Sequence, residues 1–214
     1  MNVFRPFRYI SKLEIEAAAI SVLMAMEAVP NHAPKWPLDS STVAEFLGLD
    51  IVWDTIENDD RGQIAARILP LEKLIEINEA IPQLQGGFGE STMAHEIGHW
   101  VLHIDGEEVE RHIRLQSLGV KLSIEPLLCC TVNDINGIEW QAQYFAGCLL
   151  MPQYILKRVT EGKQLNKWQH LYQIAEDLGV TISNLVHRLQ DLGLIYLLRD
   201  SKTIYLGKNI INSQ

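Results

Sequence analysis

The sequence predicts an α+β fold: a core with a small antiparallel sheet and one helix that bears the candidate site, followed by a helix-turn-helix module. Three observations predict it. β-type runs lie close together in residues 49–78, strong helical patterns flank them, and residues 171–206 contain two helical runs and a hairpin pattern. The length of 214 residues allows a substantial core, and we expect two parts, residues 1–156 and 157–214.

The first expected element is a helix over residues 11–28. It stops before Val29-Pro30, and its apolar residues recur at helical spacing as Leu13, Ala17, Ile20 and Met24. After a proline-rich connector, Asp39 supplies a capping signal for a short helix that runs through Phe46. These two helices should precede the sheet.

Residues 49–55, 62–69 and 74–78 are the expected strands. The run Pro70-Leu71-Glu72-Lys73 between the last two suits a hairpin, so we expect an antiparallel sheet. If residues 62–69 form a sheet edge, an extended substrate could pair with it, a hypothesis that proline at Ile64 would test.

The second half of the core is expected to contain two longer helices. Glycines at 86–89 break the chain, and a capped helix then runs from Glu90 to about His103. Residues 105–133 match no clear pattern. The other helix is expected over residues 136–151 and is stopped by Pro152.

The C-terminal part is expected to be winged-helix-like. Residues 171–192 predict two helices about the turn Leu178-Gly179-Val180-Thr181, and residues 195–198 with 203–206 predict a hairpin. Within residues 157–208, eight Lys or Arg stand against five Asp or Glu, although the whole chain has a net charge of −9. That local excess is too small to indicate nucleic-acid binding by itself.

Composition indicates the compartment. The chain has three cysteines, an odd number that suggests no disulfide framework and therefore a reducing environment. The N-terminal residues lack the apolar core and cleavage site of a secretory signal, and no run reaches transmembrane length. We expect a cytoplasmic protein that does not contact a membrane.

The chemical signal is the run His95-Glu96-Ile97-Gly98-His99 in a predicted helix. Positions i and i+4 lie on one helix face, so His95 and His99 can share one tetrahedral ion. Glu96, beside the first ligand, is placed to act as the general base of a zinc metallopeptidase that activates water for attack on a peptide carbonyl. We therefore predict Zn²⁺ as the cofactor.

A catalytic zinc usually has a third protein ligand. Glu139 is the stronger candidate, because it heads an apolar stripe where an ionised carboxylate is costly unless paired or bound to metal. Asp105 falls where a longer zinc motif places its last ligand. It is the weaker candidate, because Leu102 stands where that motif needs a turning glycine. The stripe comprises Ala142, Phe145, Ala146 and Leu149.

Several other polar residues have plainer interpretations. His103 continues the i+4 row but lies about 12 Å along the helix from His95, so we interpret it as a helix-end residue. His112 and Tyr144 are the candidates for stabilising the developing oxyanion. The cysteines are expected in the core, and they are Cys129, Cys130 and Cys148.

Two signatures together resemble the ImmA/IrrE family of metallopeptidases. They are the run from His95 to His103 and the block Glu139-Trp140-Gln141-Ala142-Gln143-Tyr144-Phe145-Ala146-Gly147-Cys148-Leu149-Leu150-Met151-Pro152. The resemblance extends more loosely over residues 61–66 and the C-terminal Leu-Gly-Val pattern. Gln143 departs from the family's usual Asn.

The resemblance to the ImmA/IrrE family implies a zincin-like core in a bacterial protein. It further implies that His95, His99 and Glu139 are metal ligands and that Glu96 is the catalytic base. The implied protein substrate is a helix-turn-helix transcriptional repressor, cut after a stress or DNA-damage signal. We therefore expect a zinc-dependent site-specific endopeptidase.

Two alternatives stay open: a DNA- or protein-binding regulator with a non-catalytic zinc site, and a metal-binding scaffold that has lost activity. In residues 174–189 the recognition helix would offer Arg188 as its one firm cation, opposed by Asp191. We therefore favour a structural or substrate-docking role for the C-terminal module over DNA binding.

Overall fold

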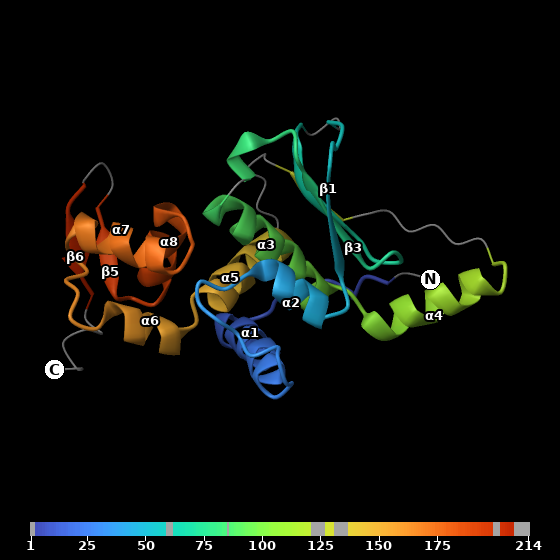
Figure 1. The fold of residues 1–214 in the computed structure, drawn as a ribbon, viewed down its shortest axis with the longest axis horizontal. Coiled ribbons are helices and arrows are strands. Elements are labelled where there is room, and N and C mark those ends of the chain that lie inside the picture. Colours follow the sequence, from blue (N-terminus) through green and yellow to red (C-terminus); the bar gives the residue numbers. More distant parts are fainter. Residues whose placement is uncertain are drawn as a thin grey trace.

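The computed structural model is a mixed α/β protein (Figure 1). It describes residues 3–58, 62–84, 86–120, 127–130, 137–198 and 202–207, the side chains of 127–130 excepted. Within these ranges the chain forms eight α-helices, a four-stranded sheet and a two-stranded sheet. None of the helices so described combines the length and the apolar character that crossing a membrane requires.

Helix α1 (Lys12–Glu27) lies against α5 (Gly137–Leu150) in the centre of the molecule. The backbone N–H of Ser11 donates to the Glu14 carboxylate at 2.9 Å, half of a capping box that confirms the predicted start. The predicted apolar face is wrong, because Leu13 and Met24 are 81% and 68% exposed. Because most residues of α1 are apolar, helical spacing alone does not determine which of two apolar faces is buried. The buried face is Ile15, Ala19, Val22, Leu23 and Met26.

Helix α2 (Ser40–Phe46) begins where its cap predicts, with the Asp39 carboxylate accepting from the Ser41 backbone N–H at 2.8 Å. The Ser40 backbone N–H then donates to the Glu90 carboxylate at 2.8 Å. Because Glu90 belongs to α3 (Gly87–His103), this hydrogen bond attaches α2 to the first turn of the helix that carries the candidate site.

The larger sheet has the strand order β1-β3-β2-β4. The predicted β2–β3 hairpin is present, and β4 pairs antiparallel with β2. The antiparallel prediction is wrong for β1: successive strands β1 and β2 run in opposite directions, but β3 inserts between them and so meets β1 in parallel. The strands are β1 (Asp50–Asp54), β2 (Ile64–Leu69), β3 (Leu74–Asn78) and β4 (Leu127–Cys130).

The position of β2 also contradicts the hypothesis that residues 62–69 form a free edge. β2 lies between β3 and β4, so its backbone hydrogen bonds already go to two neighbours. An extended substrate could not pair with it. Proline at Ile64 would disturb the sheet rather than test substrate binding.

The start of α3 differs from the prediction, because the glycines at 87–89 belong to the helix. A Cβ atom on Gly89 would lie 1.9 Å from the Leu84 carbonyl oxygen, so glycine allows α3 to contact the 3₁₀ turn η1 (Pro82–Leu84). A Cβ on Gly87 would lie 2.8 Å from the Gly179 carbonyl oxygen. These glycines therefore serve close packing rather than a chain break.

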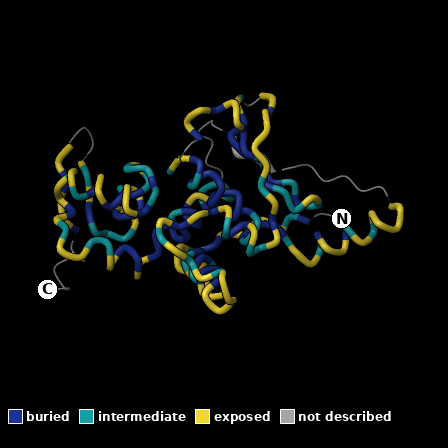
Figure 2. Tube along the Cα trace, in the orientation of Figure 1, coloured by how far each residue is buried: buried dark blue, intermediate teal, exposed yellow. Residues whose placement is uncertain are grey.

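Residues 105–133 include α4 (Gly106–Ser117), which the sequence did not predict. Its largely exposed surface is visible in Figure 2, where buried residues gather around α3 and α5. Part of this segment, and the predicted helix start at Asn136, lie outside the described residues.

The C-terminal part contains the two predicted helices, α7 (Trp168–Asp177) and α8 (Ile182–Asp191), and the predicted hairpin of β5 (Ile195–Leu197) and β6 (Ile204–Leu206). An unpredicted helix, α6 (Gln153–Thr160), precedes them. The expected boundary between residues 156 and 157 falls inside α6. These elements lie together at one end of the molecule in Figure 1.

Arg188 is an internal residue of this fold, only 3% exposed. Its Nη2 donates to the Glu16 carboxylate of α1 at 2.7 Å, and its Nε donates to the Met151 carbonyl at 3.2 Å. The guanidinium also lies over the Tyr144 ring at 5.7 Å. The cation that a recognition helix would present to DNA instead joins α8 to α1 and α5.

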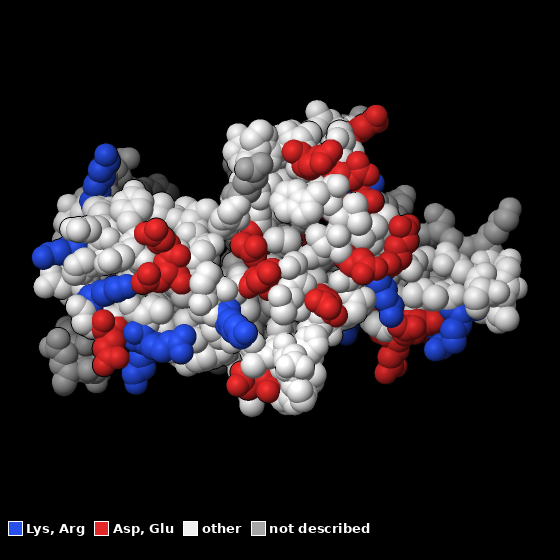
Figure 3. Space-filling model, viewed as in Figure 1, with Lys and Arg blue, Asp and Glu red and all other residues white. Residues whose placement is uncertain are grey.

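Lysines and arginines on the face shown in Figure 3 are interspersed with acidic residues and form no continuous basic surface there. Binding to the DNA backbone relies on clustered cations. This face therefore lacks the charge pattern of a nucleic-acid interface.

Loss of the buried Arg188–Glu16 pair should destabilise the protein. We expect Arg188→Met to lower the free energy of unfolding by about 3 kcal/mol, because it leaves the largely buried Glu16 carboxylate without its cation. The matched control is Lys12→Met, which breaks an exposed α1–α8 pair, Lys12–Asp191, and should cost less than about 1 kcal/mol. Urea unfolding measures both, and equal losses would contradict the assigned role.

Candidate metal centre

Helices α3 and α5 cross closely at Gly98 and Ala142. A Cβ atom on Gly98 would lie 3.0 Å from the Ala142 carbonyl oxygen and 3.1 Å from its Cα, so any larger residue would push the helices apart. His95 precedes Gly98 by three positions, and Glu139 precedes Ala142 by three positions. The glycine therefore brings the turn that carries His95 close to the turn that carries Glu139.

Glu139 heads the buried face of α5, as the apolar stripe predicts. All four residues of the stripe are completely buried: Ala142, Phe145, Ala146 and Leu149. The Glu139 side chain itself is 24% exposed, which leaves its carboxylate between the packed interior and solvent. Packing of the stripe thus determines where this carboxylate lies.

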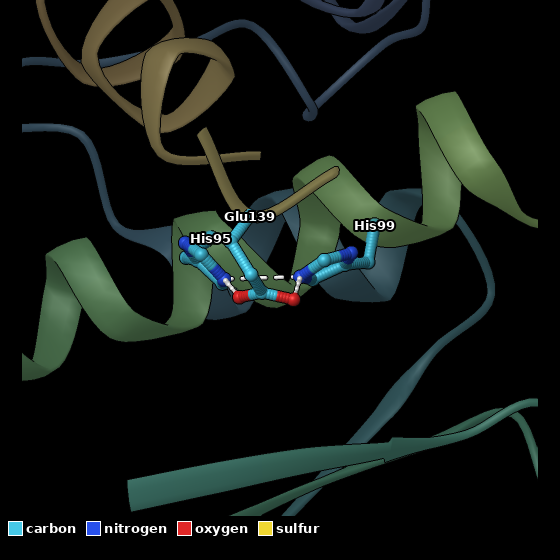
Figure 4. Close-up of side chains that lie close together, drawn as sticks. All are labelled: His95, His99 and Glu139. Atoms are coloured by element: carbon cyan, nitrogen blue, oxygen red, sulfur yellow. Dashed lines mark hydrogen bonds and ion pairs between the residues drawn. The ribbon is translucent and has the colours of Figure 1, made fainter. Parts of the chain in front are cut away.

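The structure brings His95, His99 and Glu139 together (Figure 4). The Glu139 carboxylate lies between the two imidazoles, with Oε2 3.1 Å from His95 Nε2 and Oε1 3.4 Å from His99 Nε2. The two Nε2 atoms are 3.0 Å apart. Three donor atoms from two helices therefore converge on one point, as the pairing of the two signatures predicts.

These distances are suitable for a metal ion. Bonds of about 2.0–2.2 Å to one tetrahedral ion would separate its ligand atoms by about 3.3–3.6 Å, within a few tenths of an ångström of the values here. Two imidazole nitrogens and a carboxylate oxygen are also a donor set that transition metals accept. The group can hold a metal ion.

The charge states of the group favour the same conclusion. Burial alone would raise the pKa of Glu139, but its hydrogen bond with His95 and its proximity to His99 hold that pKa well below its ordinary range. Burial lowers the pKa of His99 to about 4. At neutral pH, Glu139 is therefore an anion and His99 a neutral base, the forms that bind metal.

Glu96 follows His95 directly in α3 and is completely buried, with 0% of its surface exposed. It is not one of the three residues that converge.

The other candidate residues lie apart from this group. Asp105 caps α4, where its carboxylate accepts from the Glu107 backbone N–H at 3.1 Å. The Nδ1 of His112 lies 2.7 Å from the Glu108 carbonyl oxygen of its own helix. The Tyr144 hydroxyl accepts from Arg188 at 3.5 Å.

Neither candidate for stabilising the oxyanion thus has a described contact with the three converging side chains. Cys148 is buried in the core as predicted. The side chains of Cys129 and Cys130 lie outside the described part of the chain.

Sequence reasoning missed Gln141. It is 1% exposed, and its Oε1 lies 2.9 Å from His103 Nε2. His103 ends α3, as predicted, and its Nδ1 lies 3.0 Å from His99 Nδ1. The α5 sequence gave no signal for it, because nothing in the pattern of that helix distinguishes Gln141 from Gln143 or shows that Gln141 contacts His103 of α3.

Comparison with known proteins gives limited information about this chain. No protein-family model matches it, and no curated protein does. Among solved structures, a Mycobacterium tuberculosis transcriptional regulator matches with a TM-score of 0.51 and 18% sequence identity. The match covers 85% of this chain and 47% of the regulator, so the chain spans about half of that protein's length. At this identity the likeness shows a shared fold alone.

Proposed function

We propose that this protein is a zinc-dependent endopeptidase of the ImmA/IrrE type with a zincin-like core. One observation carries the proposal: ligand atoms of His95, His99 and Glu139 lie within 4.8 Å of one another, and the buried Glu96 follows His95 on the same helix. The two signatures that motivated the prediction thus supply one group of side chains.

Zinc is the metal that we assign to this group. Catalytic zinc sites use three protein ligands, often two His and one Glu, and keep a fourth position open. A bound Zn²⁺ supplies Lewis-acid polarisation of a substrate carbonyl and lowers the pKa of water towards neutrality. A structural zinc site would instead close the fourth position with another protein group, and no fourth residue joins the group among the described residues.

Glu96 performs the proton transfers in this proposal. Its carboxylate accepts a proton from the attacking water as the oxygen forms a bond with the scissile carbonyl carbon. The same carboxyl then donates that proton to the departing amine as the peptide C–N bond breaks. Burial of Glu96 in α3 excludes bulk water from this transfer.

The proposed substrate is a regulatory protein, namely a helix-turn-helix transcriptional repressor. This assignment rests on the resemblance of the runs His95–His103 and Glu139–Pro152 to the ImmA/IrrE family. In the proposal the C-terminal module supports the core or docks the substrate, because Arg188 is committed to contacts with Glu16 and Met151.

The second candidate is a DNA- or protein-binding regulator with a non-catalytic metal. Its supporting observation is the likeness of fold to a transcriptional regulator, together with the helix-turn-helix of α7 and α8. The internal position of Arg188 argues against DNA recognition by α8. A structural site also does not require a carboxyl group next to its first ligand in the sequence.

Three measurements on the purified protein separate the two candidates. We expect about one zinc per chain by elemental analysis, cleavage of the purified repressor encoded beside this gene, and no sequence-specific retention in a low-salt gel shift. Zinc binding with specific DNA retention and no cleavage would favour the regulator. Absence of any bound divalent metal would overturn both.

A further inference from the structure

A chain of hydrogen bonds leads from the metal-facing group to the N-terminal segment. His99 Nδ1 lies 3.0 Å from His103 Nδ1, and His103 Nε2 lies 2.9 Å from Gln141 Oε1. Gln141 Nε2 then donates to the Arg8 carbonyl oxygen at 3.0 Å. The three side chains are at least nine-tenths buried, so water does not compete for these positions.

The backbone carbonyl of Arg8 sets the direction of every proton in this chain. A carbonyl oxygen can only accept, so the amide nitrogen of Gln141 must face it and the amide oxygen must face His103. That oxygen accepts from the Nε2–H of His103, which leaves Nδ1 of a neutral His103 as an acceptor. Nδ1 of His99 must then be the donor, and its Nε2 keeps the lone pair.

The orientation of His99 agrees with this assignment. In Figure 4 the Nε2 of His99 faces the Glu139 carboxylate and its other ring nitrogen points away from it. The contact between His99 Nε2 and Glu139 Oε1 is the longer of the two, at 3.4 Å compared with 3.1 Å between His95 Nε2 and Oε2. The hydrogen-bond chain through Nδ1 thus leaves the lone pair of His99 on Nε2, the nitrogen that faces the metal-binding group.

We propose that His103 and Gln141 are positioning residues, which hold His99 in the tautomer and ring orientation that present Nε2 to the metal. The inference rests on the proposed metal site and goes further, because it assigns roles to two residues that bind neither metal nor substrate. Partners of this kind fix the tautomer of a ligating imidazole and raise its basicity.

The arrangement also links the two ligand-bearing helices. His103 lies on α3 with His95 and His99, and Gln141 lies on α5 with Glu139. The N-terminal segment that carries the Arg8 carbonyl is also attached to α3, because the Arg5 backbone N–H donates to the His103 carbonyl oxygen at 2.8 Å. The hydrogen-bond chain therefore fixes the relative position of the ligands as well as one tautomer.

The test begins with metal affinity in shape-matched variants. We expect His103→Leu to raise the Kd for Zn²⁺ about 10- to 100-fold. His103→Asn has a similar branched shape and keeps an acceptor close to the Nδ1 position, so its Kd should stay within a few fold of wild type. Gln141→Leu should weaken binding, and the same change at the exposed Gln143 of α5 should not.

The second readout is spectroscopic and needs no catalysis. In ¹⁵N-histidine-labelled protein we expect His99 to carry its proton on Nδ1, with a scalar coupling across the N–H···N bond to His103 Nδ1. His103→Leu should abolish the coupling. A proton on Nε2 of His99, without this coupling, would contradict the assigned tautomer.

The outcomes separate this inference from the proposed function. If wild type binds zinc but the Leu and Asn variants at 103 have equal affinity, the positioning role is wrong and the metal site stands. If wild type binds no metal, the metal-free spectrum still decides the inference: a proton on Nδ1 of His99 supports it, and a proton on Nε2 overturns it.

Discussion

Glu96→Gln is expected to lower the rate of repressor cleavage by at least about 10²–10⁴-fold without loss of zinc, because glutamine keeps the shape of the side chain but cannot accept the proton of the attacking water. The three residues that can hold the metal are unchanged, and Glu96 is not among them. The variant has a neutral amide of the same shape where wild type has a buried carboxyl group. Because a neutral group is less costly to bury than a charged one, the fold should be retained.

The measurement is the cleavage rate of wild type and variant at equal zinc content. Glu90→Gln is a matched control on the same helix, since residue 90 contacts Ser40 of α2 and lies outside the metal-binding group. Equal cleavage by Glu96→Gln and wild type would refute the assigned base. Loss of zinc in Glu96→Gln would mean that this carboxyl supports the ligands rather than the chemistry.

Local signals in the sequence were sufficient for several elements. The capping signal at Asp39 marks the helix start that the structure shows, because a cap acts on its own first turn. The β2–β3 hairpin was predictable for the same reason. In each case the stabilising contact joins residues that are near in sequence.

Features that depend on distant partners were not predictable. The parallel pairing of β1 with β3 depends on which strand inserts between neighbours, and no pattern within β1 encodes that. The buried face of α1 depends on what packs against an apolar helix. Burial of Arg188 depends on Glu16, which lies 172 residues away in the chain.

In the candidate site, too, features set by residues near in sequence were predictable and features set by distant contacts were not. His95 and His99 could be paired from their spacing, and Glu139 could be added because a carboxylate at the head of an apolar stripe needs a partner. The role of Gln141 could not be inferred, because it depends on the contact of Gln141 with His103 of α3, a residue distant in the sequence. Patterns within a helix thus find His95, His99 and Glu139, whereas only the contact between α3 and α5 identifies Gln141.

Glu139→Gln should abolish tight zinc binding. Removal of a ligand should raise the Kd for Zn²⁺ by more than the about 10–100-fold expected when a hydrogen-bond partner of a ligand is lost. The reason is that the two remaining imidazoles cannot complete the site. The amide also lacks the negative charge that Glu139 maintains through its hydrogen bond with His95. Cleavage should fall in parallel with metal occupancy.

Asp105→Asn is the informative control for Glu139→Gln, because Asp105 is the other residue that the sequence offers as a third ligand. Asparagine is as good an N-cap as aspartate, so α4 should stay intact and zinc affinity should match wild type. Thermal unfolding adds an independent readout: zinc should raise the Tm of wild type and of Asp105→Asn but not of Glu139→Gln, because only a protein that binds the ion in its native state is stabilised by it. The reverse pattern would transfer the third ligand to Asp105, and zinc stabilisation of all three proteins would place the ion elsewhere.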